Sequence, residues 1–222
     1  MEKYAIIVAG GKGTRMGSEL PKQFIEIHEC PILVHTIRAF VDVDPATKII
    51  LVLPEDQIDR WSEMAEKFDL QSVETAIGGD TRYQSVKNGL GLIANNETIV
   101  AVHDAVRPCI DPNLINQTFE VAQNSGNAVV CVPSKDSLRK KMGDQTQSVD
   151  RTDYFLVQTP QVFRYDLLKA AYAQPYQTHF TDDASVVESL GVEIQVVLGD
   201  YRNIKITTPE DLLIASQYLD KK

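Results

Sequence analysis

Cysteine and histidine are scarce in this sequence, and neither residue has the spacing of a metal site. The three cysteines are scattered at Cys30, Cys109 and Cys131, without a C-x-x-C pair. An odd, scattered set fits a reducing compartment better than a disulfide framework. The four histidines show neither the H-x-x-x-H nor the H-E-x-x-H spacing that zinc sites use. We therefore expect buried, unpaired cysteines and no zinc site.

The sequence also lacks an excess of positive charge and any long apolar run. It has 22 Lys and Arg residues against 31 Asp and Glu residues, for a formal net charge of -9. Nucleic-acid binders usually carry a basic face, and no apolar run approaches the ~18 residues that indicate a membrane helix. No signal-peptide pattern precedes the first apolar run. We therefore expect no nucleic-acid partner, no membrane segment and a cytoplasmic location, while nucleotide binding stays open because local cations decide it.

The length and the apolar content fit one folded domain. The chain has 222 residues, of which 43% are hydrophobic. This is enough for a sizeable core, and the length is typical of a single domain. No internal repeat or low-complexity segment divides the chain. We expect one domain over residues 1–222.

A glycine-rich stretch follows the first apolar run. Residues 4–8 are typical of a buried strand, and the stretch Ala9-Gly10-Gly11-Lys12-Gly13-Thr14-Arg15-Met16-Gly17 comes next, with Pro21-Lys22 soon after. Small residues let backbone N–H groups approach an anion closely. Arg15 and Lys22 add positive charge. The stretch therefore predicts a triphosphate site.

Two common phosphate loops do not fit this stretch. A P-loop has the pattern G-x-x-x-x-G-K-[ST], but Lys12 is followed by Gly13. A dinucleotide-binding turn has G-x-G-x-x-G, but Met16 stands where the third glycine belongs, and Gly17 comes one position late. The stretch instead resembles the G-x-G-T-R-M…P-K signature of nucleotidyltransferases that activate sugars and polyols.

Apolar runs alternate with helical patterns along the chain. Strands are expected at residues 4–8, 48–53, 74–77, 98–102, 128–132, 193–198 and 203–206. Helices are expected at residues 32–40, from about 58 to 68, from about 81, after an Asp111 cap, at 165–173, after a Thr181 cap and after Thr208. This order predicts an α/β fold with a Rossmann-like, mostly parallel sheet and helices on both faces.

Polar motifs follow three of the expected strands. They are the glycine-rich stretch, Gly79-Asp80 and His103-Asp104. Ligands on such sheets bind beyond the carboxyl ends of the strands, so we expect the three motifs to meet at one edge. Lys205 lies in the apolar run 203–206. Because a buried Lys is rare without a partner, we expect an anionic ligand beside it.

The pattern of buried strands and helices breaks over residues 134–158. Basic residues there alternate poorly with few apolar ones, and Gly143-Asp144 is a turn signal. We expect two polar strands around that turn. Such a protruding β-arm could not bury a face alone, and a second subunit could support it.

Eight motifs, taken in order from Ala5 to Leu213, are similar to those of the 2-C-methyl-D-erythritol 4-phosphate cytidylyltransferases of the non-mevalonate isoprenoid pathway. Six or more ordered motifs rarely coincide by chance. The motifs are A-G-G-K-G-T-R-M (9–16), P-K-Q (21–23), G-G-D-T-R-Y-Q-S-V (78–86), H-D-A-V-R-P (103–108), V-D-R (149–151), Q-T-P-Q-V-F (158–163), T-D-D-A-S (181–185) and N-I-K-I-T (203–207).

The resemblance implies a fold of the nucleotide-diphospho-sugar transferase type and CTP as the nucleotide. Arg15 and Lys22 would grip the triphosphate and stabilise the transition state. A second group would read the cytosine and its surroundings, and one residue would lie near the ribose. The implied CTP contacts are Ala9, Gly10, Gly13, Arg15, Lys22, Gly79, Asp80, Ser85 and Ala105.

The resemblance also implies an acceptor site, a metal and a partner subunit. Arg151 and Lys205 would position the methylerythritol phosphate. Mg²⁺ would be held mainly by phosphates, with Asp104 as a protein ligand. Arg151 and Thr159 would come from the partner in a homodimer, so the active site would be composite. The implied acceptor contacts are Asp104, Arg107, Ser137, Arg151, Thr159 and Lys205.

Elementary chemistry agrees with these implied roles. An ionised phosphate monoester must attack an α-phosphorus that already carries negative charge, and pyrophosphate must leave. The barrier is therefore mainly electrostatic and positional. Fixed cations and a metal ion lower such a barrier, and the reaction requires no Ser-His pair or acidic dyad.

Two alternatives stay open at the level of sequence. The related ribitol 5-phosphate cytidylyltransferases share the glycine-rich loop, H-D-A-x-R-P and N-I-K-x-T, but differ around G-G-D and V-D-R. Here Asp136-Ser137 departs from the usual Asp-Thr of the methylerythritol family, although serine keeps the hydroxyl. The other alternative is a non-catalytic CTP-binding sensor, which would need only the nucleotide contacts and not all four of Arg15, Lys22, Arg151 and Lys205.

Overall fold

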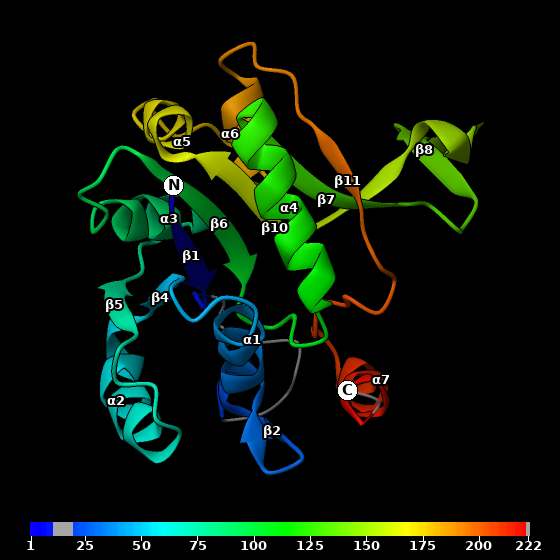
Figure 1. The fold of residues 1–222 in the computed structure, drawn as a ribbon. Helices are drawn as coiled ribbons and strands as arrows, with labels where there is room; N and C mark the ends of the chain where they lie inside the picture. The colour runs from blue at the N-terminus through cyan, green and yellow to red at the C-terminus, as the bar shows by residue number, and fades with distance from the viewer. Residues whose placement is uncertain (11–19, 221–222) are drawn as a thin grey trace.

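A computed structural model of the chain describes residues 1–10 and 20–220. Its centre is a sheet of seven strands in the order β11-β7-β10-β6-β1-β4-β5 (Figure 1). Neighbouring strands are parallel except where β10 pairs with β6 and β7. The strands are β1 (Glu2–Val8), β4 (Lys48–Leu53), β5 (Glu74–Ile77), β6 (Thr98–Asp104), β7 (Asn127–Pro133), β10 (Phe155–Arg164) and β11 (Val196–Leu198). The prediction of a mostly parallel sheet is confirmed.

Helices cover both faces of the sheet, as the alternating pattern predicted. They are α1 (Ile32–Val41), α2 (Ile58–Lys67), α3 (Arg82–Leu90), α4 (Pro112–Ser125), α5 (Tyr165–Ala171), α6 (Asp183–Glu188) and α7 (Pro209–Leu219). One apolar cluster packs α1, α2 and α4 on one face, and a second packs α3, α5 and α6 on the other. Trp61 lies in the first cluster, and its side chain is buried core. Burial of these faces is the main favourable term in folding.

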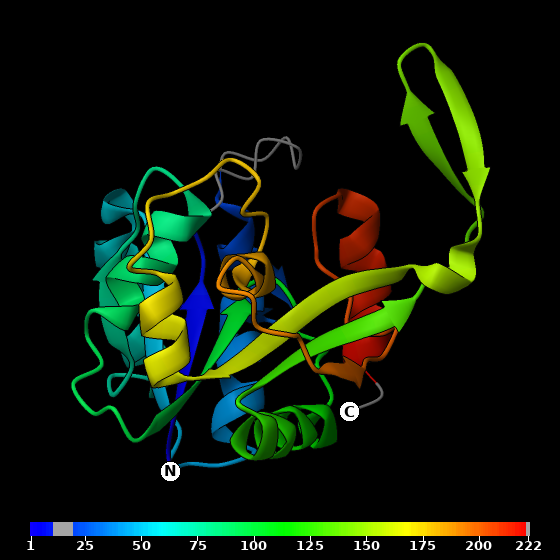
Figure 2. The ribbon, with the colours of Figure 1, turned by 90° about the horizontal axis from the view of Figure 1, so that it is seen from above.

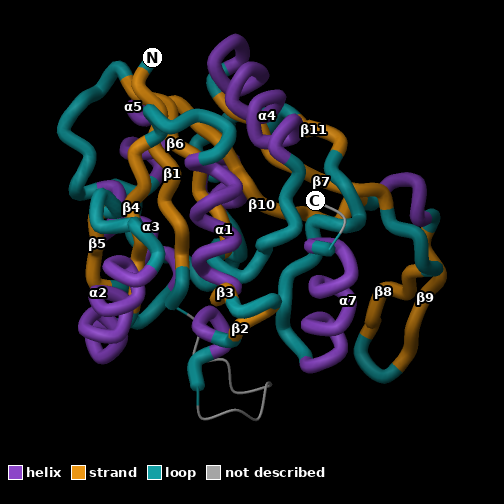
Figure 3. Tube along the Cα trace, turned by 60° about the horizontal axis from the view of Figure 1, so that its bottom comes forward, coloured by secondary structure: helices purple, strands orange, loops and turns teal. Residues whose placement is uncertain are grey.

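A third apolar cluster attaches α7 to the body. It joins Ala215 of α7 to Ile27 of a small hairpin and to Ile32 at the start of α1. Figure 3 shows α7 next to this hairpin. The hairpin consists of β2 (Glu26–Ile27) and β3 (Cys30–Pro31), after the short helix η2 (Lys22–Phe24). Thr208 caps α7 in a capping box with Asp211, and Pro209 takes the first helical position, as the sequence predicted.

The predicted pair of polar strands is present. β8 (Leu138–Met142) and β9 (Gln145–Val149) pair antiparallel around Gly143, whose φ is 64°. Figure 2 shows this yellow-green hairpin projecting away from the rest of the chain. The expected arm of residues 134–158 overlaps the main sheet, because β10 begins at Phe155. Between the hairpin and β10 lies the short helix η4 (Arg151–Asp153).

In two places the sequence predictions are wrong. Residues 203–206 form no strand; Ile206 is buried in the third apolar cluster and Ile204 packs against it from an irregular segment. The helix expected after a Thr181 cap is capped instead by Asp182, whose side chain accepts a hydrogen bond from the Ser185 backbone N. Asp182 forms a capping box there. The sequence alone did not show whether Thr181 or the adjacent Asp182 caps the helix.

Two elements are shorter than the sequence predicted. β11 is shorter than the expected strand over 193–198, and α5 ends at Ala171 rather than at residue 173. Cys30, Cys109 and Cys131 are all buried, and none of them forms a disulfide within the described residues. The helices of residues 1–10 and 20–220 include none that combines the length and apolarity needed to cross a membrane. The short helix η3 (Glu55–Gln57) leads into α2.

Candidate active site

The carboxyl ends of four strands bring the predicted motifs to one edge of the sheet. Val8 at the end of β1 is the register partner of Asp104 at the end of β6. On the other side, Leu53 of β4 pairs with Ile77 of β5, just before Gly78. Neighbouring parallel strands therefore place the start of the glycine-rich stretch, Gly79-Asp80 and Asp104 around one cavity, as expected.

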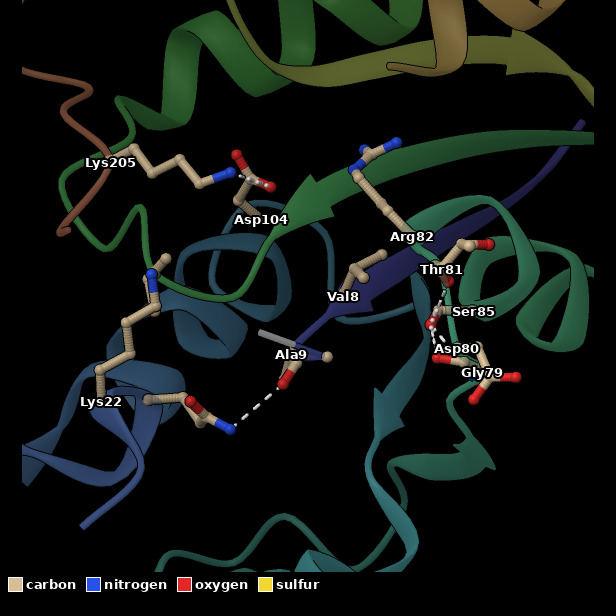
Figure 4. Close-up of a pocket in the computed structure, with 13 residues that line it drawn as sticks. Val8, Ala9, Lys22, Gly79, Asp80, Thr81, Arg82, Ser85, Asp104 and Lys205 are labelled. Atoms are coloured by element: carbon tan, nitrogen blue, oxygen red, sulfur yellow. Dashed lines mark hydrogen bonds and ion pairs between the residues drawn. The ribbon is translucent and has the colours of Figure 1, made fainter. Parts of the chain in front are cut away.

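This first cavity has a volume of about 310 Å³, which falls within the range of small-molecule sites. Figure 4 shows Lys22 and Lys205 on one side and Gly79, Asp80 and Ser85 on the other. Eight of the predicted contacts line it: Ala9, Gly10, Lys22, Gly79, Asp80, Ser85, Asp104 and Lys205. The predicted contacts Gly13 and Arg15 lie outside the described residues.

The Gly79 side of the cavity is built around Ser85. The Ser85 hydroxyl accepts a hydrogen bond from the Gly79 backbone N at 3.1 Å and donates to the Thr81 carbonyl at 2.9 Å. Thr81 caps α3 by accepting from the Gln84 backbone N. A Cβ on Gly79 would lie 2.2 Å from Cγ of Gln84, so only glycine fits without a shift. The loop thus presents backbone groups at a fixed position.

Gln23 supports the Ala9 side of the cavity, and sequence reasoning did not assign it a role. Its buried amide donates to the Ala9 carbonyl at 3.1 Å and to Oε1 of Gln57 at 2.6 Å. The half-buried Lys22, on the same short helix η2, donates from Nζ to the Ile206 carbonyl at 3.2 Å. The P-K-Q motif carried the signal, since Gln23 follows Lys22 directly. Together these contacts fix the ammonium group at the rim of the cavity.

Asp104 lies between two cations. Its Oδ2 accepts from Nε of Arg107 at 2.9 Å, and its Oδ1 accepts from Nζ of Lys205 at 3.1 Å. Burial alone would raise the pKa of Asp104, but Lys205, Arg107 and Arg82 hold that pKa well below its ordinary value. The carboxylate is therefore charged at neutral pH, and it holds both cations at the cavity.

The sequence suggested that Lys205 lies in a buried strand, but the structure shows that it does not. Its side chain is 42% exposed in the irregular segment before α7, and Asp104 is its ionic partner. Because the ammonium group is accessible at the cavity wall, it is available to an anion as well as to Asp104.

A second cavity of about 270 Å³ adjoins the first. It contains Arg107 and Thr159, both predicted acceptor contacts, and the two cavities share Arg82, Asp104 and Lys205. Sequence reasoning missed Arg82, Thr181 and Asp182 as lining residues, although the G-G-D-T-R and T-D-D motifs contain them.

Thr159 belongs to the site of its own chain, so the prediction that a partner subunit supplies it is wrong. Its buried hydroxyl accepts a hydrogen bond from the Asp104 backbone N at 3.0 Å. Its carbonyl accepts from Nδ2 of Asn203 at 2.8 Å, and the Asn203 carbonyl in turn accepts from Nη1 of Arg107. The strand β10 runs back from the arm into the sheet, which sequence order alone did not reveal.

Three other predicted residues line neither cavity. Ala105 is fully buried, and its backbone N donates to the Val8 carbonyl. Ser137 is exposed just before β8. Arg151 is exposed in η4 and donates from Nη1 to the Lys135 carbonyl. Contacts of these residues with substrate remain predictions.

Metal ligands are sparse around the cavities. The described residues contain no group of three or more His, Cys, Asp or Glu side chains suited to one ion. The carboxylates that line the first cavity are Asp80 and Asp104. Hard divalent cations take carboxylate and phosphate oxygens, so these residues fit a metal that bound phosphates hold in large part.

His103 is a fully buried, neutral neighbour of this cluster. Its Nε2 lies 3.3 Å from the Arg107 carbonyl oxygen, and its ring packs edge-on against Phe40. Burial disfavours the charged ring and lowers the pKa of His103 from 6.5 to about 3, with Asp104 opposing and Arg107 adding to the effect.

We expect acid to destabilise the fold through His103. The unfolded chain binds a proton below pH 6.5, whereas the folded chain stays neutral down to about pH 3. The stabilisation is therefore complete above the unfolded pKa and is lost as the pH falls towards the folded one. Between pH 7 and pH 5 this residue should lower the free energy of unfolding by about 2 kcal/mol. Urea unfolding at pH 7 and at pH 5, both in EDTA, measures this change in the free energy of unfolding. His103→Gln should show a smaller pH dependence, and equal pH dependence in both proteins would contradict the account.

The chain is similar to proteins of one family over nearly its whole length. The family model IspD, described as 2-C-methyl-D-erythritol 4-phosphate cytidylyltransferase, matches residues 4–221. A protein of that name from Bacteroides thetaiotaomicron is 48% identical over 221 residues, covering 99% of this chain and 100% of the relative. One from Bacillus velezensis is 40% identical over 220 residues, covering 97% and 94%.

Solved structures agree. The 4-diphosphocytidyl-2C-methyl-D-erythritol synthase of Anaerococcus prevotii superposes with a TM-score of 0.83 at 30% identity, covering 98% of this chain and 97% of that one. The 2-C-methyl-D-erythritol 4-phosphate cytidylyltransferase of Thermus thermophilus gives a TM-score of 0.78 at 31% identity, with full coverage of both chains. With the motifs gathered at one sheet edge and these similarities over the whole length, the chain belongs to the 2-C-methyl-D-erythritol 4-phosphate cytidylyltransferase family.

Proposed function

We propose that this chain transfers CMP from CTP to 2-C-methyl-D-erythritol 4-phosphate, giving 4-diphosphocytidyl-2-C-methyl-D-erythritol and pyrophosphate. The observation that carries the proposal is the pair of adjoining cavities with a shared cationic wall. One cavity suits a nucleotide and the other a small phosphorylated polyol. Membership of the family supports both assignments.

The proposed chemistry is a single displacement at phosphorus. An oxygen of the acceptor phosphate forms a bond to the α-phosphorus of CTP, and the bond from that phosphorus to the bridging oxygen breaks as pyrophosphate leaves. Lys205 and Arg107 are proposed to hold the acceptor phosphate beside the nucleotide. Lys22, and Arg15 as the sequence predicts, are proposed to stabilise the charge that develops on the triphosphate. Rate enhancement comes from position and from fixed positive charge.

The nucleotide is assigned to the first cavity. Backbone groups at Ala9 and Gly10, together with Gly13, are proposed to bind phosphates, because small residues allow close approach. The loop of Gly79 and Asp80, held by Ser85, is proposed to recognise cytosine.

The proposed reaction uses a divalent cation, and Mg²⁺ is the ion that suits phosphate oxygens in nucleotidyl transfer. When bound, the ion withdraws charge from the phosphates. Asp104 is the proposed protein ligand, since it lines both cavities. Its oxygens already accept hydrogen bonds from Arg107 and Lys205, so phosphates would supply most of the coordination.

We also propose one domain over residues 1–222, with residues 134–158 as an arm that joins two chains. The β8–β9 hairpin of the arm is largely polar, and the end of the arm carries exposed apolar residues at Tyr154, Phe155, Leu156 and Val157. A homodimer would cover these side chains and bring Arg151 to the partner's acceptor site. Cysteines that form no disulfide fit a proposed location in the cytoplasm.

Subunit mixing tests whether Arg151 acts on the partner's site. Lys22→Ala and Arg151→Ala variants, each nearly inactive alone, should regain about a quarter of wild-type activity when unfolded together and refolded at equal amounts, because half of the dimers would then carry one intact site. Each variant refolded alone is the control. A mixture that stays inactive would contradict action across the dimer.

The proposed function is tested by pyrophosphate release from CTP and Mg²⁺, with methylerythritol 4-phosphate and ribitol 5-phosphate measured side by side. We expect turnover with the first, little with the second, and loss of activity in EDTA that Mg²⁺ restores. Turnover with ribitol phosphate alone would overturn the assignment of the acceptor. CTP binding without turnover of either would indicate a sensor.

A further inference from the structure

A polar cluster joins the walls of the two cavities. Arg82, the first residue of α3, lines both. Its Nη1 donates to Oδ1 of Asp183 at 2.9 Å, and its Nη2 donates to Oδ2 at 2.6 Å. The Tyr172 hydroxyl donates to the same Oδ1 at 2.6 Å. Both Asp183 oxygens are therefore engaged, and Arg82 is held by two parallel hydrogen bonds.

This geometry fixes the direction of the Arg82 side chain. A guanidinium that binds a carboxylate through two nitrogens has far less freedom than one on a single contact. The Asp183 side chain is 0% exposed and the Arg82 side chain is 28% exposed. In Figure 4 the Arg82 side chain extends away from Gly79 and Asp80. The carboxylate thus holds a charged side chain at the surface of the site from a buried position.

The cluster also connects one segment from each side of the site. Arg82 comes directly after Gly79, Asp80 and Thr81, which line the first cavity. Asp183 comes directly after Thr181 and Asp182, which line the second. The Arg82–Asp183 pair is therefore a direct link between the nucleotide side and the acceptor side.

Stability alone is a weak reason for such a cluster. A buried ion pair often contributes little net stability, because its desolvation offsets much of the attraction between the charges. Burial would lower the pKa of Arg82, yet Asp183 raises that pKa above its ordinary value. Arg82 therefore stays charged within a wall that faces two anionic substrates.

We infer that Asp183 and Tyr172 are positioning residues that hold Arg82 in the wall shared by the two cavities, and so align the nucleotide with the acceptor. The inference rests on the proposed function for the identity of the substrates. Without Asp183 the Arg82 charge would lose its partner and would turn towards Asp104 or a bound phosphate. Misplacement of reacting groups by about 1 Å can reduce a rate by as much as 10²-fold.

The test compares Asp183→Asn and Tyr172→Phe with a matched control, Tyr83→Phe. Tyr83 is also buried and stacks on Tyr172 with ring centroids 4.7 Å apart. Its hydroxyl donates to the Tyr172 and Gln174 carbonyls, whereas the hydrogen bonds to the Asp183 carboxylate come from Tyr172 and Arg82. Tyr172→Phe and Tyr83→Phe therefore each remove one buried hydroxyl from the same region, but only the first loosens Asp183.

We expect kcat/KM for the acceptor to fall about 30-fold in Asp183→Asn and about fivefold in Tyr172→Phe, with part of each loss in kcat. Tyr83→Phe should stay within about twofold of wild type, even where its thermal midpoint falls as much as that of Tyr172→Phe. CTP affinity at equilibrium should weaken in Asp183→Asn, because Arg82 lines the first cavity as well.

Equal kinetic effects of Tyr172→Phe and Tyr83→Phe would overturn the inference, as would wild-type kinetics in a folded Asp183→Asn protein. If Asp183→Asn does not fold, the two tyrosine variants decide the question. If the wild type itself releases no pyrophosphate, the proposed function fails, and CTP affinity in the same variants then decides whether the cluster positions the nucleotide side.

Discussion

Replacing Lys22 with alanine should lower kcat about 100-fold, the cost typical of removing one fixed electrostatic donor from a transition state. The ammonium group lies at the rim of the first cavity, where its Nζ donates to the Ile206 carbonyl at 3.2 Å. Negative charge increases on the departing pyrophosphate during the reaction, so the interaction strengthens as the bond breaks. The KM for CTP should change much less than kcat, because the charge difference arises mainly in the transition state.

A matched control for this change is Lys3→Ala. Lys3 also has an ionic partner, Asp44, at 3.0 Å, but it lies at the amino end of β1, opposite the cavity. Its removal should leave kcat within about twofold of wild type, since a surface pair contributes little. Steady-state pyrophosphate release measures both variants. If Lys22→Ala keeps wild-type kcat and loses only CTP affinity, the residue binds the ground state and does not act in the transition state.

The order of strands and helices could be predicted because burial leaves a strong mark on the sequence. The continuous apolar run 48–53 coincides with β4, and Asp111 and Pro112 start α4 as expected. Edge strands and loop segments were harder to predict from the sequence. Residues 203–206 contain two isoleucines, Ile204 and Ile206, that pack in the third apolar cluster, and nothing in such a short run separates a strand from an irregular segment.

Eight of the residues that line the first cavity could also be predicted, because most of them lie in short motifs near the carboxyl ends of strands. Contacts between distant segments could not. Arg82 was invisible as a functional residue because Asp183 lies 101 positions away. Thr159 was assigned to the wrong chain because the return of β10 into the sheet brings it to Asp104. Such pairings depend on topology and not on local pattern.

Replacing Asp104 with asparagine should lower the free energy of unfolding by about 3 kcal/mol, because loss of one partner leaves buried charges without compensation. The Asp104 and Arg107 side chains are each 10% exposed, and Lys205 approaches the same carboxylate. With a neutral amide, the two cations repel each other and no longer share an anchor. Turnover should fall as well, since the same contacts orient Arg107 and Lys205 towards the acceptor. Urea unfolding and pyrophosphate release measure the two effects.

Two further variants separate this account from simple loss of a surface pair. Asp44→Asn removes the carboxylate of a more exposed ion pair with Lys3, and it should cost less than about 1 kcal/mol. In the double variant Asp104→Asn/Lys205→Met, one of the two opposing cations is absent, so stability should be higher than the sum of the single effects predicts, by about 1 kcal/mol. Strict additivity would show that Asp104 and Lys205 do not interact in the folded protein. Turnover in the double variant should stay low although part of the stability returns, because both the Lys205 ammonium and the carboxylate that orients Arg107 are then missing from the acceptor side.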